Sequence, residues 1–330
     1  MNNLKATQRE QKIYGSLVEI MKRENDCTAY RIIDKSGEVV MTSYTVFPGI
    51  ELIYNDVHMQ ICQVDADPPK NILEINHCRE GRIECEFDNG EYLYLSKGDL
   101  SIQLKDGSCH NSYFPLSHYH GISVAIDLEE APKCLSCILD DVSVDPTELS
   151  KKFCRTDKYM VMRSKPCFEH IFSELYTIPG HIKRGYFKIK VLELLLFLSG
   201  VNLDSERLAQ KYFPKYQVDR VKSIKKYLVE NICQHITLDE LSQKFDIPLT
   251  SMKTCFKGVY GTTIYSFIRN YKMQSAAMLL KQSDKNIIEI AGMVGYDNGS
   301  KFAGAFKKVM NVTPKEYRNK TVQMEPFLTK

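Results

Sequence analysis

The stretch GYDNGSKFAGAFKKVMNVTPKEYR, residues 295–318, joins apolar, small and basic residues in one short segment. Phe302 and Phe306 are four residues apart, a spacing that places both on one face of a helix, and Lys307 and Lys308 follow directly. Elsewhere the segment offers Gly, Ser and Ala, where an exposed helix usually has long charged side chains. Lysine pairs with phosphate, and small residues let a large partner come close. This chemistry suits a helix that is buried on one side and touches a polyanion on the other.

A second copy of this arrangement lies 49 or 50 residues earlier. The stretch from Leu241 through Phe256 to Gly261 corresponds to the stretch from Ile290 through Phe306 to Asn311. Thr237, followed by Glu240 three residues later, predicts a capped helix start for the first copy. Each copy therefore reads as a short helix, a tight turn and a second helix, which is the outline of a helix-turn-helix.

The alternative is a plain helical bundle, whose apolar stripes would serve only as core. Two copies that each end in basic residues favour the helix-turn-helix, because its second helix lies in the major groove and its far end meets phosphates. We expect Lys257 in the first copy, and Lys307 and Lys308 in the second, to pair with phosphates.

Residues 220–320 resemble the DNA-binding domain of the AraC/XylS family of bacterial transcription regulators. The resemblance is strongest in IIEIAGMVGYDNGSKFAGAFKKVMNVTPKEYR and extends to TLDELSQKFDI and YSFIRNYKMQSAAMLL. It implies two helix-turn-helices joined by one long helix from Ile264 to Leu280. It also implies a protein that binds specific double-stranded DNA, with RNA polymerase as a further candidate partner.

The resemblance carries the family's DNA-contacting positions onto this sequence. Carried over, they are Thr250, Lys253 and Thr254 in the first motif and Gly299, Ser300, Ala303 and Gly304 in the second. The expected DNA contacts also include Ser251, Lys257, Lys301, Lys307 and Lys308. The family often has bulkier polar residues where this chain has Ala303 and Gly304. We therefore expect the first motif to read most of the bases, with Lys253 on guanine and the threonine methyls on thymine, and the second motif to dock mainly on phosphate. A phosphate contact is the alternative for each of the base-reading residues.

The amino-terminal half has a different pattern. From Gly37 to Leu128 apolar and polar residues alternate between frequent turns, which predicts a β-sandwich or small barrel. The segment YLSKGDLSIQL at 94–104 resembles a segment of a cupin domain. The expected fold class is α+β multidomain, with an amino-terminal cupin-like β-barrel, dimerisation helices and an all-α double helix-turn-helix. The predicted boundaries are a β-rich effector-sensing domain at 1–130, a helical dimerisation region at 131–203, a linker at 204–217 and the DNA-binding domain at 218–322.

Four histidines are weak candidates for ligand binding in the β-rich half. His118 and His120 are two apart on a predicted strand and so share one face, and His77 and His110 lie elsewhere in the sequence. Because no glutamate follows at the spacing of a cupin metal motif, we expect no metal and no cofactor. We expect no catalytic residue either, since no nucleophile elbow, phosphate-binding loop or Rossmann fingerprint occurs. The rival hypothesis is a cupin-type metalloenzyme or sensor with a fused helical domain.

Charge is divided unevenly along the 330 residues. From Lys215 onward 19 Lys and Arg face 10 Asp and Glu, a net of +9, whereas the preceding part has 25 against 31, a net of −6. A basic third attached to an acidic body fits a polyanion partner for that third alone. The pair Cys134 and Cys137 lacks a second pair for a zinc site, and the eleven cysteines predict free thiols.

The most apolar run, VLELLLFLSGV at 191–201, contains Glu193 and is too short to span a bilayer. With a polar start that is no secretory signal, the chain is expected to be cytoplasmic, without membrane contact. We expect the helix that holds this run to pack on the barrel or to form a homodimer, with Leu195 in the dimer interface. The resemblance also implies a small-molecule effector that binds the amino-terminal domain.

Overall fold

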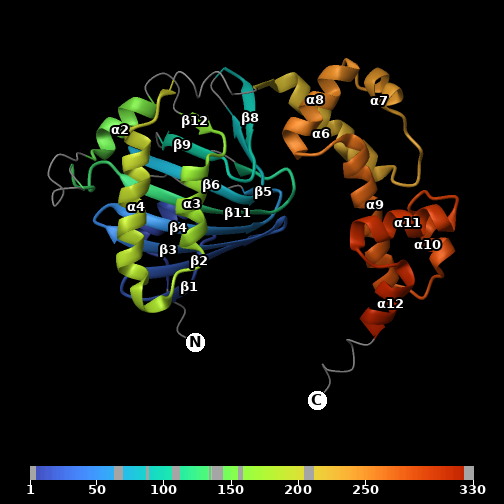
Figure 1. Ribbon diagram of the computed structural model, residues 1–330, viewed down its shortest axis with the longest axis horizontal. Coiled ribbons are helices and arrows are strands. Elements are labelled where there is room, and N and C mark those ends of the chain that lie inside the picture. The colour runs from blue at the N-terminus through green and yellow to red at the C-terminus, as the bar shows by residue number, and fades with distance from the viewer. Residues whose placement is uncertain are drawn as a thin grey trace. The chain divides into compact units, whose positions relative to one another are not determined.

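The computed structural model describes residues 5–62, 70–86, 89–105, 112–133, 135, 144–154, 159–203 and 212–322. The chain divides into two compact units, Met1–Tyr212 and Phe213–Lys330, and each is described by itself (Figure 1). His110, Cys134 and Cys137 lie outside the described residues, as does 204–211 of the predicted linker. Six of the described cysteines are free thiols, namely Cys27, Cys78, Cys154, Cys167, Cys233 and Cys255.

The first unit is built on an antiparallel sheet of eight strands in the order β1-β2-β3-β4-β11-β6-β9-β12. Their bounds are β1 (Glu19–Arg23), β2 (Cys27–Asp34), β3 (Gly37–Phe47), β4 (Ile50–His58), β6 (Ile72–Gly81), β9 (Leu100–Lys105), β11 (Tyr119–Asp127) and β12 (Tyr159–Met162). Two shorter antiparallel pairs accompany it, β5 (Ile61–Cys62) with β10 (Ser112–Tyr113), and β7 (Ile83–Glu86) with β8 (Glu91–Leu95).

This sheet is open. β1 and β12 occupy opposite edges, so the described strands do not close into the barrel that the cupin-like pattern predicted. One reason is that β12 pairs with β9 and so extends the sheet at its edge, although β12 comes from the predicted helical region at 131–203. Another is that β7 pairs with β8 as a separate hairpin, so the chain leaves the large sheet between β6 and β9.

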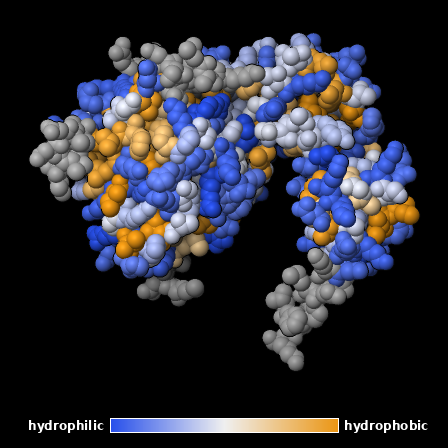
Figure 2. All heavy atoms as spheres, viewed as in Figure 1, coloured by the Kyte–Doolittle hydropathy of each residue, from blue (hydrophilic) through white to orange (hydrophobic). Residues whose placement is uncertain are grey.

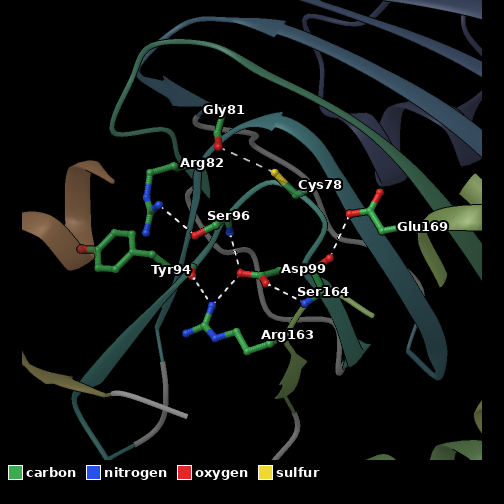
Figure 3. A network of polar contacts seen from close by, with 9 residues as sticks. All are labelled: Cys78, Gly81, Arg82, Tyr94, Ser96, Asp99, Arg163, Ser164 and Glu169. Carbon is green, nitrogen blue, oxygen red and sulfur yellow. Dashed lines mark hydrogen bonds and ion pairs between the residues drawn. The ribbon is translucent and has the colours of Figure 1, made fainter. Parts of the chain in front are cut away.

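A buried polar network holds the turn between β8 and β9 (Figure 3). The carboxylate of Asp99 accepts a hydrogen bond from the Ser96 N–H at 2.8 Å and another from the Ser164 N–H at 3.1 Å. It also pairs with the Arg163 guanidinium, with an Oδ2–Nη1 distance of 2.6 Å. The chain turns at Gly98, which has φ +84°. The carboxylate of Asp99 is bonded to Arg163 and Ser164, which follow β12. β8 and β9, on either side of this turn, belong to different sheets.

Side chains alternate between two cores, one on each face of the sheet. On β4, Leu52 belongs to the core beneath the helices and Ile53 to the core on the opposite face. The helices α2 (Pro146–Phe153), α3 (Pro166–Leu175) and α4 (Lys183–Ser199) cover the first face (Figure 1). The 3-10 turn η1 (Gly180–Ile182) precedes α4, and α1 (Gln8–Tyr14) lies near the start of the chain.

The second unit is helical after the short segment β13 (Phe213–Pro214). Its helices are α6 (Lys215–Glu230), α7 (Leu238–Lys244), α8 (Leu249–Tyr260), α9 (Ile264–Gln282), α10 (Ile287–Met293), α11 (Gly299–Met310) and α12 (Pro314–Val322). Since α6 begins at Lys215, the last residues of the predicted linker at 204–217 are already helix. Among the described residues, no helix combines the length and the apolar character that a membrane crossing needs.

Candidate nucleic-acid interface

The first helix-turn-helix consists of α7, a turn and α8. The Thr237 hydroxyl accepts a hydrogen bond from the Glu240 N–H at 3.2 Å, and the Glu240 carboxylate accepts one from the Thr237 N–H at 2.7 Å. These bonds complete the predicted capping box and lower the pKa of Glu240. In the turn, Asp246 has φ +46°, and Arg220 of α6 pairs with its carboxylate at 3.0 Å. Aspartate tolerates this left-handed conformation better than most residues do.

The two faces of α8 differ sharply. Its inner face is buried and consists of Met252, Cys255, Phe256, Val259 and Tyr260. Thr250, Lys253 and Lys257 are exposed, and Ser251 and Thr254 are partly exposed. Gly261 ends the helix in the left-handed conformation with φ +74°. All five predicted contact residues of this motif therefore lie on solvent-accessible positions of one helix.

The second helix-turn-helix consists of α10, a turn and α11. Asn286 caps α10 in the same reciprocal manner, with Glu289 as its partner. Asn298 caps α11, and its side-chain oxygen accepts hydrogen bonds from the N–H groups of Ser300 at 2.9 Å and Lys301 at 3.0 Å. The turn takes its left-handed step at Gly295, 49 residues after Asp246. α11 starts 50 residues after α8, so the second turn is one residue longer than the first.

On α11 the inner face is formed by Phe302 and Phe306, both wholly buried against α9 and α10. The predicted contact positions are accessible to solvent. Ser300, Lys301, Gly304, Lys307 and Lys308 are exposed, and Gly299 and Ala303 are partly exposed. A Cβ added at Gly304 would meet no atom within 4 Å. The small residue there is thus not required by packing, and it leaves the helix surface bare.

A second link joins the two motifs besides α9. Cys233 follows α6, and its thiol donates to the Met293 carbonyl oxygen at 2.8 Å. A Cβ at Gly295 would lie 2.5 Å from the Cys233 carbonyl oxygen, so only glycine allows the backbone to approach this closely. The segment between α6 and α7 therefore braces the turn of the second motif.

The lysines of the interface are available to an anionic partner. Lys253, Lys257, Lys301, Lys307 and Lys308 are all exposed. Within the described part of the chain, none of them takes part in an ion pair, whereas Lys226 on α6 pairs with Glu230 at 3.9 Å. An ammonium without an internal partner keeps its full attraction for phosphate.

The histidine candidates do not converge. His77 is buried beneath α3, where its ring stacks on Phe172 with centroids 4.1 Å apart, and burial lowers its pKa to about 4. His118 and His120 lie near each other at the start of β11, with ring centroids 6.2 Å apart. Of the described histidines in the predicted set, only this pair could share a ligand.

Sequence reasoning missed two features. Asn298 positions the start of α11 through its cap, and the only sequence signal was an Asx residue just before the predicted helix. Asp56 and His58 on β4 lie beside His120. No local signal could have found them, because strand register is a long-range property.

The geometry defines a DNA-binding domain with two helix-turn-helices. A family described as "Helix-turn-helix domain" matches residues 241–320. The Transposon Tn10 TetD protein of Escherichia coli is 32% identical over 106 residues, which cover 32% of this chain and 77% of that protein. The xylose operon regulatory protein of Escherichia coli K12 is 33% identical over 93 residues, 28% of this chain and 24% of that protein.

The chain belongs to the AraC/XylS family of DNA-binding transcription regulators. Among solved structures, it is similar to the C-terminal domain of AraT, a response regulator from Geobacillus stearothermophilus. That match has 28% identity and a TM-score of 0.31, and it covers 34% of this chain and 91% of that one. The chain spans about a quarter of the xylose operon regulator's length.

Proposed function

We propose that this protein recognises specific operators, with α8 reading most of the bases and α11 docking mainly on phosphate. The observation that carries the proposal is the difference at matched helix positions. α8 offers Lys253 and Thr254 where α11, 50 residues later, has Ala303 and Gly304. Lysine and threonine can contact base edges in the major groove, whereas glycine and alanine offer no polar group to a base.

The test is selection from random duplexes by the full-length protein, followed by titration of the selected duplex and a scrambled duplex at several salt concentrations. We expect one strongly constrained base patch for α8 and a weaker one for α11. Affinity should fall steeply with salt, because each neutralised phosphate releases condensed counterions. Selection without any consensus would contradict sequence-specific binding, and equal constraint in both patches would contradict the division of labour.

We also propose a homodimer formed through α4 and the turn before it. Ile182, Ile189 and Leu196 are seven residues apart and are 45%, 62% and 45% exposed, and Phe197 beside them is 45% exposed. Figure 2 shows hydrophobic residues gathered over α4. A repeat of seven suits a second helix packed alongside, so a second copy of the chain is the partner that this stripe fits. Leu195, the residue expected in the interface, is instead wholly buried in the core of its own unit.

The remaining proposals concern regulation. We propose that the first unit takes up a small-molecule effector and that the bound protein contacts RNA polymerase, as membership of the family implies. An effector must change operator affinity when it binds, because only unequal affinity for the two states of the protein shifts their populations. Operator titration with and without a candidate compound is the direct measurement.

A further inference from the structure

Three neighbouring strands place acidic and imidazole side chains in one row on the sheet. In the register of β4 and β11, Asp56 lies directly opposite His120, and on the other side of β11 His120 lies opposite Glu80 of β6. His58 is two residues after Asp56 on β4 and therefore points to the same face. His118 is likewise two residues before His120.

The ligand atoms in this row are close together. Oδ1 of Asp56 lies 2.8 Å from Nε2 of His58 and 3.1 Å from Nδ1 of His120, and the three atoms are all within 4.8 Å of one another. Nitrogen and oxygen ligands about 2.0–2.2 Å from one ion stand roughly 3.0–3.5 Å apart. The spacing of these atoms is therefore close to that of a mononuclear metal site.

The two contacts between Asp56 and the imidazole rings are ion pairs only when the rings are protonated. Oδ1 of Asp56 is inaccessible to solvent and has no hydrogen-bond partner within the described residues, despite its two short contacts with imidazole nitrogens. A buried oxygen without a partner is unfavourable. An ion between the carboxylate and the two rings would satisfy this oxygen and both nitrogens together.

We propose that Asp56, His58 and His120 bind a divalent transition-metal ion, with Zn²⁺ as the simplest occupant. Two imidazoles and one carboxylate suit zinc and its neighbours better than Ca²⁺ or Mg²⁺, which prefer oxygen ligands alone. The side chains of Asp56, His58 and His120 are 50%, 58% and 31% exposed, so an ion can enter from solvent. Glu80 and His118, whose Oε1 and Nε2 atoms are 4.0 Å apart, stand beside the site as further donors.

The missing glutamate had argued against a metal in this half of the chain. Residues near His118 and His120 in the sequence do not supply the required carboxylate. The structure supplies the carboxylate and one imidazole from β4, more than 60 residues earlier in the chain. This site does not depend on the proposed DNA contacts.

The experiment is a calorimetric titration of the full-length, chelator-treated protein with Zn²⁺. Cys134 and Cys137 are both replaced by serine in every sample, so that this pair cannot bind the ion. We expect one equivalent to bind and to raise the Tm, because an ion held only by the folded state stabilises it. His58→Ala, His120→Ala and Asp56→Asn should each weaken binding by at least about 10-fold, since each alters one of the three proposed ligands.

His170→Ala is the matched control. His170 forms an ordinary ion pair with Glu174 on one helix at 3.0 Å, and its removal should leave Zn²⁺ affinity unchanged. Asp56→Asn keeps the shape of the side chain and guards against misfolding, and the Tm of each metal-free variant checks for it. Absence of binding, or equal affinity in the parent and the His58→Ala variant, would overturn the proposal. So would an equal loss in the control.

Discussion

Lys253 is the residue on which the proposed base readout by α8 chiefly rests. It is exposed on the outer face of the helix and has no ion-pair partner within the described residues. Lys253→Ala should weaken binding to the selected operator by about 1–3 kcal/mol and relax the preference at the base it contacts. Scrambled DNA should lose much less affinity. The measurement is titration of both duplexes by fluorescence anisotropy.

Lys226→Ala is the control for this variant, since Lys226 lies on α6 and already pairs with Glu230. It should leave the ratio of specific to scrambled affinity unchanged. If Lys253→Ala weakened both duplexes equally, the lysine would be a phosphate contact and base readout by this residue would be ruled out.

His77 makes stability depend on pH. Neither ring nitrogen has a hydrogen-bond partner among the described residues, and burial lowers the pKa from 6.5 to about 4. Below about pH 6.5 the His77 ring is therefore protonated in the unfolded chain. In the folded protein the same ring stays neutral until the pH falls to about 4. Stability is full above pH 6.5 and should fall by about 3 kcal/mol as the pH drops to 4.

His77→Leu removes the titrating ring and keeps an apolar contact with Phe172. We expect this variant to lose that part of the pH slope between pH 6.5 and 4 and to be at least as stable as the parent at low pH. Urea unfolding of both proteins across this range measures the effect. Identical slopes would mean that the ring is protonated without cost in the folded state.

Single residues with local roles were readable from the sequence, and residues with long-range roles were not. Thr237 marks a helix start through contacts with a residue three positions away, as expected. Gly261 ends α8 through a bond to a residue four positions away. His77 gave no sign that it would be buried, because an alternating strand does not reveal which face is covered. Asp56 was missed for the related reason that its partner is on another strand.

Among the elements, α11 depends on its two phenylalanines. Phe306 is wholly buried and contacts Tyr317 of α12, with ring centroids 5.6 Å apart, as well as Phe302. Phe306→Ala should destabilise the second motif by roughly 3–5 kcal/mol, through lost burial and the cavity that remains. Thermal unfolding followed by circular dichroism measures it. Lys308→Ala, on the exposed side of the same helix, is the control, and equal melting curves for both variants would contradict this packing.

The helices of the second unit followed from sequence far better than the sheet of the first. The bounds of α9 were predicted within about two residues, because caps and the 3.6-residue period are local. The strands were also detected by alternation, but their order was not. β12 joins the sheet from beyond the predicted β-rich domain, and the open edge that results could not be foreseen from alternation alone.

At the scale of the whole molecule, the exposed stripe on α4 is the surface that we propose for dimerisation. Ile189→Asp should leave the fold intact, because this side chain is 62% exposed, and should convert the dimer to a monomer. A charge at the centre of an apolar interface is strongly unfavourable. Sedimentation velocity gives the oligomeric state directly. Leu195→Asp should instead unfold the first unit, and an Ile189→Asp variant that sediments like the parent would exclude this interface.

The contact between Cys233 and Gly295 has a mechanical consequence. Because both α9 and this brace join the two motifs, α8 and α11 are held at a set angle to each other. A duplex that engages both helices must adapt its curvature to the protein, and bending a site of this size costs roughly 1–6 kcal/mol. The base pairs between the two contacted patches should then influence affinity through their stiffness alone. We expect the protein to bind more tightly to operators with flexible pyrimidine–purine steps in that spacer, even where no side chain contacts those steps.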